Sequence, residues 1–335
     1  MSFDVLTMGR IGVDIYPHQI GVPLAEVETF GKFLGGSPTN VACATARYGH
    51  SSAVVSKVGA DAFGTFVRKA LHDLHVDDRY VGTEESVPTP VTFCEIFPPD
   101  DFPLYFYRNP IAPDLLLAAD ELDLAAIREA TIFWATVTGL SVQPSREAHL
   151  AAWRARARSG ITILDLDWRS MFWDDPSQAR PLIQEALSYC TIAIGNREEC
   201  EVAVGESEPD RAADALLDLG LEIAVVKQGP KGVLAKTRQD RVEVPPMPVD
   251  VVNGLGAGDA FGGAFCHGLL SGLGIERTLA FANVAGAIVA SRLECSTAMP
   301  TEAEVLGHLD GTAEQDGRPE HPAKPGQEPS KGRVR

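Results

Sequence analysis

The segment Asn253-Gly-Leu-Gly-Ala-Gly-Asp259 carries the strongest chemical signal in the sequence. It precedes an apolar, glycine-rich stretch that predicts a helix over Asp259–Leu270. Glycines allow the backbone N–H groups of Gly256, Ala257 and Gly258 to turn toward one point, and a helix N-terminus adds positive potential there. Such a turn binds phosphate oxygens without side chains. Asp259 is therefore a candidate general base beside an anion site, although plain helix capping explains this segment equally well by itself.

A second glycine-containing segment, Gly35-Gly-Ser-Pro-Thr-Asn40, opens a predicted helix over Thr39–Tyr48. Paired glycines allow a ligand to approach the backbone closely, and the Asn40 amide can both donate to and accept from hydroxyl groups. Taken alone, this segment is explained slightly better by an ordinary turn with a helix cap. The sequence contains no G-x-x-x-x-G-K-[ST] motif and no dinucleotide-binding fingerprint, which excludes P-loop chemistry.

The overall composition narrows the classes of partner. The chain has 335 residues, 46 acidic and 29 basic, and a net charge of −17. This excess of negative charge argues against binding to nucleic acid or to anionic membranes. With no long uncharged apolar run and no basic, apolar leader at the start, we expect a cytoplasmic protein. The six cysteines form no C-x-x-C pair, so we expect small buried apolar residues rather than disulfides or a zinc site.

The elements that must position these segments alternate between apolar runs of strand length and alanine-rich amphipathic stretches. This alternation predicts an α/β fold with a mainly parallel sheet covered by helices on both faces. The C-terminal third is mostly helical. The predicted strands are Val5–Met8, Ala53–Val58, Thr131–Thr136, Ile161–Leu166, Thr191–Ile194 and Ile223–Val226. The other predicted helices are Phe63–Leu74, Ser145–Arg158, Asp210–Leu219, Ile275–Ala290 and Glu302–Leu309.

Two segments interrupt that alternation, Ile11–Val22 and Pro90–Arg108. The second contains two strand-like runs joined by a turn-forming Pro-Pro-Asp-Asp sequence, which predicts an antiparallel hairpin. We interpret the two segments as a small sheet that projects from the main domain. From 311 to 335 the composition becomes rich in Gly, Pro, Glu, Gln and Lys without periodicity, which predicts a disordered tail after a single domain of residues 1–310.

Together, the two glycine segments resemble the two signatures of the PfkB, or ribokinase-like, carbohydrate kinase family. The first reads G-G-x-P-x-N-x-A, followed by Gly49 and Gly59 at the family spacing. The second resembles D-T-x-G-A-G-D, with Asn253 and Gly254 in place of the usual Asp and Thr. The resemblance spans roughly residues 4–308. It implies a ribokinase-like three-layer α/β/α fold with a small β-sheet lid. It also implies use of ATP and Mg²⁺, and a homodimer formed through the lid.

The resemblance also assigns residues to the two ligands. Asp14 matches the family's acceptor of sugar hydroxyl groups, although its position alone suggests a solvated loop residue. Gly35, Gly36 and Asn40 are expected to bind the sugar as well. On the nucleotide side, Glu199 of an N-x-x-E motif is expected to help hold magnesium, largely through water. Residues expected to border the nucleotide, each also explained by a turn, a cap or a surface position, are Asn196, Lys227, Gly229, Gly232 and Asn283.

Three further segments resemble the 5-dehydro-2-deoxygluconokinase branch of the family: 30–36, 93–108 and 165–169 with Trp173. The last matches a D-x-[DN]-x-R-x-x-x-W pattern shared with 2-keto-3-deoxygluconate kinases, whose substrate is also a sugar acid. Arg108 and Arg169 are therefore candidate partners of a substrate carboxylate, because guanidinium suits bidentate carboxylate binding; the alternative is salt bridging within the protein.

The implied activity is ATP-dependent phosphorylation of the C6 hydroxyl of 5-dehydro-2-deoxygluconate, in inositol catabolism. The alternatives are a 2-keto-3-deoxygluconate kinase or fructokinase of the same fold, and, in another class, a non-catalytic protein that senses a sugar or nucleotide. Asn253 and Glu294 both depart from the residues usual near the family's monovalent-cation loop, so potassium activation is doubtful.

Overall fold

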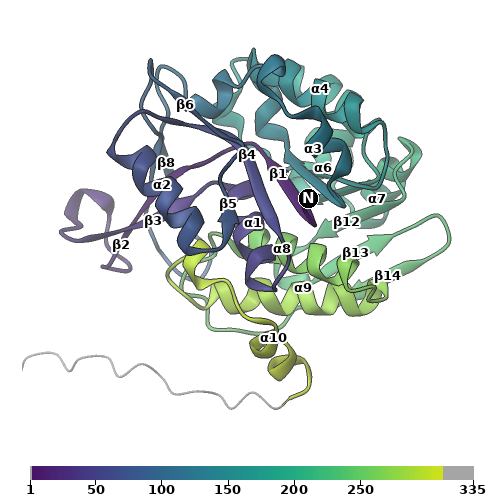
Figure 1. The fold of residues 1–335 in the computed structure, drawn as a ribbon. Coiled ribbons are helices and arrows are strands. Elements are labelled where there is room, and N and C mark those ends of the chain that lie inside the picture. Colours follow the sequence, from purple (N-terminus) through teal and green to yellow (C-terminus); the bar gives the residue numbers. More distant parts are fainter. Residues whose placement is uncertain (1, 312–335) are drawn as a thin grey trace, which may run out of the picture.

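The computed structural model describes residues 2–311 and places most of their strands in one large, twisted sheet (Figure 1). Its strand order is β14-β13-β12-β11-β10-β9-β1-β4-β5, with β6 also paired to β4. All these pairings are parallel except β12–β13 and β13–β14. The strands are β1 Val5–Met8, β4 Ser52–Gly59, β5 Val76–Asp77, β6 Val81–Glu84, β9 Ile132–Thr136, β10 Ile161–Asp165, β11 Ile192–Asn196, β12 Ile223–Lys227, β13 Val233–Lys236 and β14 Arg241–Val244.

Helices cover both faces of this sheet, which confirms the predicted three-layer architecture. Successive strand residues point to opposite faces, so a strand buried on both sides is apolar throughout. In β9, Phe133 packs toward one layer of helices and Trp134 toward the other. The first layer holds α3 Leu124–Glu129, α4 Ser145–Arg156, α5 Ala179–Leu187, α6 Arg197–Val204 and α7 Pro209–Asp218. The second holds α1 Ser37–Arg47, α8 Ala257–Leu270, α9 Ile275–Ala290 and α10 Glu302–Leu309, with α2 Ala62–Asp73 packed near β4.

A separate four-stranded sheet projects beside the main one, in the order β3-β2-β7-β8. The prediction of a small projecting sheet is confirmed, and so is the antiparallel hairpin, formed by β7 and β8. One strand of this small sheet was not predicted. β3 contains two glycines and a lysine, and it forms because its backbone pairs along the whole length of β2. The strands are β2 Gly12–Pro17, β3 Phe30–Gly35, β7 Val91–Cys94 and β8 Leu104–Tyr107.

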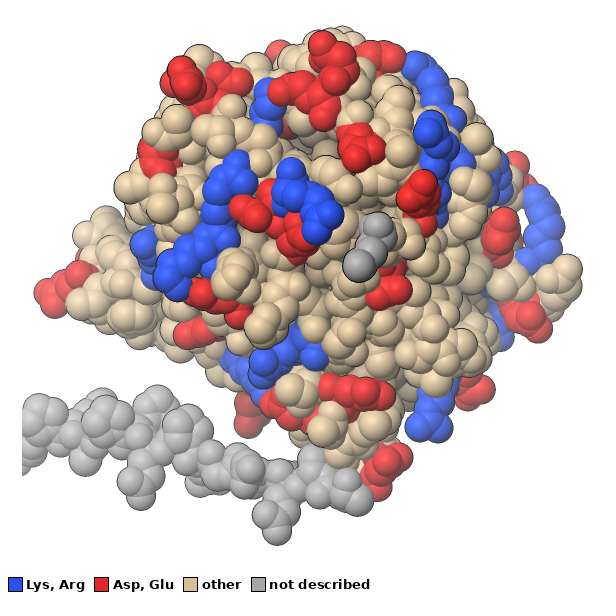
Figure 2. Space-filling model, in the orientation of Figure 1, with Lys and Arg blue, Asp and Glu red and all other residues tan. Residues whose placement is uncertain are grey.

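Burial and surface charge agree with the composition. All six cysteines are buried, as expected for small apolar packing residues. No helix of the described residues is long and apolar enough to cross a bilayer. On the face shown in Figure 2, acidic side chains are interspersed with lysine and arginine rather than separated from them. The predicted disordered tail, apart from Gly311, lies outside the described residues.

Candidate active site

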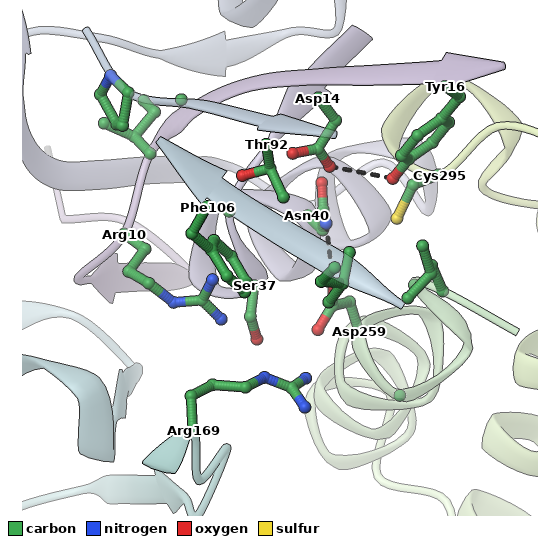
Figure 3. A pocket seen from close by; sticks show the side chains of 18 of the residues that line it. Arg10, Asp14, Tyr16, Ser37, Asn40, Thr92, Phe106, Arg169, Asp259 and Cys295 are labelled. Carbon is green, nitrogen blue, oxygen red and sulfur yellow. Dashed lines mark hydrogen bonds between the residues drawn. The ribbon is translucent and has the colours of Figure 1, made fainter. Parts of the chain in front are cut away.

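The fold brings the two glycine segments together, although their key residues are 219 positions apart. Asn40, in the first turn of α1, donates a hydrogen bond from Nδ2 to Oδ2 of Asp259, in the first turn of α8, at 2.8 Å (Figure 3). Within the described residues, the buried Oδ1 of Asn40 has no hydrogen-bond partner. The Asn40 amide therefore orients the Asp259 carboxylate and keeps an acceptor for a further hydroxyl group.

Steric crowding fixes the turn before α8. Gly256 has a φ of +80°, and a Cβ built on it would lie 1.9 Å from Sγ of Cys295. The buried side chain of Asn253 anchors the same turn, because its Oδ1 accepts from the Leu255 N–H and its Nδ2 donates to the Leu293 carbonyl. The first intrahelical bond runs from Ala260 N to Gly256 O. The N–H groups at the start of α8 lie before this bond, as in any helix, and can bind an anion.

Asp259 is held in an environment that favours its protonation. Burial raises the pKa of its carboxyl, while the hydrogen bond from Asn40 partly opposes that rise. A carboxylate of raised pKa is a stronger base than an ordinary aspartate, which suits proton abstraction from a hydroxyl group.

A cavity of about 170 Å³ lies between the small sheet and the start of α8. It gathers most of the residues predicted to bind the acceptor or to perform chemistry. Among those predicted residues, its lining includes Asp14, Gly36, Asn40, Arg108, Arg169, Gly256, Gly258 and Asp259. Gly35 and Ala257 do not line the cavity themselves, but each is adjacent in sequence to residues that do.

Asp14 projects from β2 into the cavity, and its Oδ2 accepts a hydrogen bond from the Tyr16 hydroxyl at 2.9 Å. Burial raises the pKa of Asp14 to about 6, against the lowering effect of the Tyr16 bond. The two neighbouring glycines are required for space. A Cβ on Gly35 would lie 2.2 Å from an Asp14 oxygen, and one on Gly36, whose φ is +106°, would lie 2.3 Å from the Arg10 carbonyl oxygen.

Both predicted arginines line the cavity, but they differ in how they are paired. Arg108 Nη2 donates to both carboxylate oxygens of the buried Asp114, at 3.0 and 2.8 Å. Arg169 Nη2 lies 3.1 Å from Oδ1 of Asp167. A third arginine, Arg10, also lines the cavity and was not predicted, because a single basic residue in an apolar run gives no spacing signal.

The predicted nucleotide-side residues begin at the carboxyl ends of neighbouring strands. Asn196 ends β11 and forms a capping box with Glu199, in which each side chain accepts from the other residue's backbone N–H. Lys227 ends β12, and its Nζ would lie 3.3 Å from a Cβ on Gly258. Although burial opposes the charged form, the carboxylates of Asp165 and Glu199 raise the pKa of Lys227. Lys227 thus brings a positive charge to the turn that precedes Asp259.

The three remaining nucleotide-side residues lie around the β12–β13 turn. Gly229 and Gly232 both have positive φ, +57° and +93°, and a Cβ on Gly232 would lie 2.1 Å from the Val244 carbonyl oxygen. Asn283 on α9 donates from Nδ2 to the Pro245 carbonyl oxygen at 2.6 Å. A Cβ on Gly232 would also contact the backbone of Pro245, so Gly232 and the Asn283 side chain both lie against Pro245.

The described residues contain no group of three or more His, Cys, Asp or Glu side chains arranged to bind a metal ion. Glu199 and Asp165 are carboxylates beside Lys227, and burial, the largest cause, raises the pKa of Asp165 to about 7. Such oxygen donors fit Mg²⁺ held mainly by phosphates and water, with only one or two protein carboxylates nearby.

The model of the pfkB family of carbohydrate kinases matches residues 3–302. This chain belongs to that family. The kinase is 33% identical over 307 residues to the 5-dehydro-2-deoxygluconokinase of Clostridium perfringens, a match that covers 90% of each chain. It is 32% identical to the enzyme of the same name from Geobacillus thermodenitrificans, over 89% of this chain and 90% of that one.

Solved structures agree on the ribokinase-like fold of this kinase. A ribokinase II from E. coli in complex with ATP and Mg²⁺ superposes with a TM-score of 0.84 at 25% identity, covering 93% of this chain and all of that one. A fructokinase with bound ATP from Xylella fastidiosa has a TM-score of 0.81 at 25% identity, covering 93% and 99% of the two chains. The protein is therefore a sugar kinase that uses ATP.

Proposed function

We propose that this kinase transfers the γ-phosphoryl group of ATP to the C6 hydroxyl of 5-dehydro-2-deoxygluconate, a step of inositol catabolism. One observation carries the choice of a sugar acid. A single small cavity holds the Asp259–Asn40 pair and the guanidinium group of Arg169 (Figure 3). A hydroxyl at one end of the substrate needs a base, and a carboxylate at the other end needs a cation. The names of the relatives support the same acceptor.

In the proposed reaction, the Asp259 carboxylate takes the proton of the C6 hydroxyl. The C6 oxygen then forms a bond to the γ-phosphorus as the bond from that phosphorus to the β,γ-bridging oxygen breaks, and ADP leaves. Asn40 holds Asp259 in place through the bond at 2.8 Å, so its other carboxylate oxygen can face the hydroxyl. Asp14 accepts from another hydroxyl group of the sugar, and the proton on Asp259 is finally lost to solvent.

The phosphoryl group is stabilised mainly by backbone in this proposal. The N–H groups of Gly256, Ala257 and Gly258 donate to its oxygens at the start of α8, where the helix dipole is positive. The Lys227 ammonium, close to Gly258, adds a full charge on the same side. Glu199 and Asp165 are the residues that would help to hold Mg²⁺, directly or through water. Bound Mg²⁺ supplies positive charge that offsets the charge of the phosphates.

The small sheet supplies the lid of the proposed site, because Asp14 and Thr92 from β2 and β7 and Phe106 from β8 line the cavity. Such a cover excludes water, which would otherwise compete with the sugar as acceptor. The opposite face of this sheet carries the partly exposed aromatic residues Phe30, Phe93 and Tyr107, which contact one another edge to face. We propose that this face pairs with a second copy of the chain, as the family resemblance implies.

The rival acceptors are 2-keto-3-deoxygluconate and fructose, and the rival class is a sugar or nucleotide sensor without activity. A phosphoryl-transfer screen with purified protein, ATP and Mg²⁺ separates all of them. We expect kcat/KM for 5-dehydro-2-deoxygluconate to exceed that for 2-keto-3-deoxygluconate and for fructose, with the phosphate on C6 of the product. Preference for fructose would reject the sugar-acid proposal, and no ATP consumption with any acceptor would reject a catalytic role.

A further inference from the structure

The three arginines that line the cavity differ in how completely their charges are balanced. Arg108 faces Asp114 one to one, and both side chains are buried. Arg10 and Arg169, by contrast, share a single carboxylate. Arg10 Nη2 donates to Oδ2 of Asp167, and Arg169 Nη2 pairs with its Oδ1. Among the described residues, neither of these two arginines makes another ion pair, so these three side chains together have a net charge of +1. The carboxylates of Asp259 and Asp114 act on Arg10 through their charge without an ion-pair contact.

Arg10 is the less exposed of the two, since its side chain is only 10% exposed and that of Arg169 is 38% exposed. Its guanidinium carbon lies 5.9 Å from the ring centre of Phe106 and 5.6 Å from that of Phe172. Both rings attract the cation and restrict its position. Burying a charge in this way is costly unless it is paired, and the one carboxylate that pairs with Arg10 is shared with Arg169.

The same arginines retain unused donors. The Nε atoms of Arg10 and Arg169 are buried and have no hydrogen-bond partner within the described residues, and the same is true of Arg108, so the shared Asp167 is what sets the first two apart. A buried donor without a partner costs free energy, and a ligand that accepts from it recovers that cost. In Figure 3 both guanidinium groups point into the cavity, away from Asp14. An anionic group on a substrate would therefore avoid Asp14 and lie against this pair.

We propose that Arg10, together with Arg169 and held by their shared Asp167, binds the carboxylate of the sugar acid and sets the preference for an acid. This inference rests on the proposed function, whose acceptor it explains. Arg108 also lines the cavity, where its balanced pair with Asp114 fixes the end of β8. Its own contact with the substrate stays a prediction, to which the structure adds Arg10, a residue that no sequence motif indicated.

The test compares 5-dehydro-2-deoxygluconate with its neutral C1 amide, which has the same shape without the charge. In wild type, kcat/KM should favour the acid. Arg10→Met keeps an apolar stem between Phe106 and Phe172 but removes the charge. We expect the acid-to-amide ratio to fall about 10- to 150-fold, the range for loss of a charge-assisted hydrogen bond. The KM for ATP should stay unchanged, because Arg10 contacts only the acceptor.

Arg10→Lys serves as the second variant, since it keeps a charge beside Asp167 and is less disruptive if Arg10→Met does not fold. It should lower the acid-to-amide ratio by a smaller factor, because an ammonium cannot bind a carboxylate in the bidentate way. The matched control is the double variant Arg68→Met/Asp78→Asn, which removes an ion pair outside the cavity and should leave the ratio unchanged.

Two results would overturn the inference: an unchanged ratio in folded Arg10 variants, or an equal fall in the Arg68/Asp78 double variant. Failure of the proposed function looks different. In that case wild type itself would show no preference for the acid over its amide or over fructose, whatever the variants do.

Discussion

The acceptor side and the phosphoryl side of the cavity are built by different means. On the proposed acceptor side, charged side chains line the cavity: Asp14, and the arginine pair that Asp167 holds. On the phosphoryl side, the ligand would meet mainly backbone, a turn that is fixed by Gly256 and by the anchoring amide of Asn253.

This difference shows where specificity and chemistry can vary separately. A turn of backbone N–H groups suits any phosphoryl group and does not depend on the acceptor. Charged side chains can be exchanged without altering the backbone, so they can select one acceptor among many sugars. Substitutions on the phosphoryl side should therefore lower turnover for every acceptor, whereas those on the acceptor side should change the order of preference.

The largest expected effect comes from changing Asp259, which lies where the acceptor side and the phosphoryl side meet. Asp259→Asn keeps the size and the contact with Asn40 but removes the base. We expect kcat to fall roughly 100-fold or more, the range for loss of a general base. ATP binding, measured by titration calorimetry, should persist, because the substitution removes a negative charge near the phosphates. Turnover within a few-fold of wild type would show that Asp259 is only a helix cap.

Gly256→Ala tests the phosphoryl side alone. The new Cβ would lie 1.9 Å from Cys295 Sγ at a φ of +80°, so the turn must move. Because a displaced backbone donor costs catalysis, we expect kcat to fall at least about 10-fold, and equally for acid and neutral acceptors. Gly272→Ala is the control. Its φ of +66° is also unfavourable for alanine, but no atom lies within 4 Å, so kcat should stay unchanged. Loss of activity in that control would assign the effect to backbone strain.

The smallest expected effect concerns the pH dependence of the acceptor side. Because burial raises the pKa of Asp14 to about 6, this carboxyl becomes protonated between pH 8 and pH 5 and loses its charge toward the sugar. The KM for the sugar acid should rise a few-fold over that range, and Asp14→Asn should flatten this dependence. A wild-type profile without an inflection near pH 6 would contradict the assignment.

The pH dependence of thermal stability tests the raised pKa of Asp14 in a second way. The folded-state pKa of Asp14 is above the ordinary value of 3.8, so the charged form is disfavoured in the folded protein. This unfavourable contribution is absent below pH 3.8, grows toward pH 6 and is constant above it. Asp14→Asn should therefore raise Tm by a few degrees at pH 8 and by less at pH 5. A lower Tm at pH 8 would mean that the charge of Asp14 stabilises the fold.

The sequence predicted the six central strands of the main sheet, β1, β4 and β9 to β12, because they are apolar on both faces, as in Phe133 and Trp134 of β9. It did not predict the outer strands β5, β6, β13 and β14. It did not predict β3, whose Phe-Gly-Lys-Phe-Leu-Gly sequence has weak strand character and depends on pairing with β2. Motif spacing identified Asn40 and Asp259 separately, but only the fold places them 2.8 Å apart.

The arginines of the cavity show more clearly what could not be predicted from the sequence alone. Arg169 follows a strand in a recognisable pattern, so it could be identified from the sequence. The tertiary fold alone brings Arg10 to Asp167, across 157 residues of chain. Arg108 differs from the other two arginines in having a carboxylate to itself. Which carboxylate pairs with which arginine depends on the tertiary fold, so no local sequence pattern predicts it.

We propose that the acceptor side of the cavity selects the sugar acid, while the phosphoryl side performs chemistry common to all acceptors. The most direct test of this claim measures kcat/KM for 5-dehydro-2-deoxygluconate and for its C1 amide with wild type, Arg169→Ala and Gly256→Ala. We expect Arg169→Ala to lower the acid-to-amide ratio about 10- to 150-fold with little change in the KM for ATP. Gly256→Ala should leave that ratio unchanged and lower kcat for both acceptors. An equal loss on acid and amide in Arg169→Ala, or a changed ratio in Gly256→Ala, would contradict the claim.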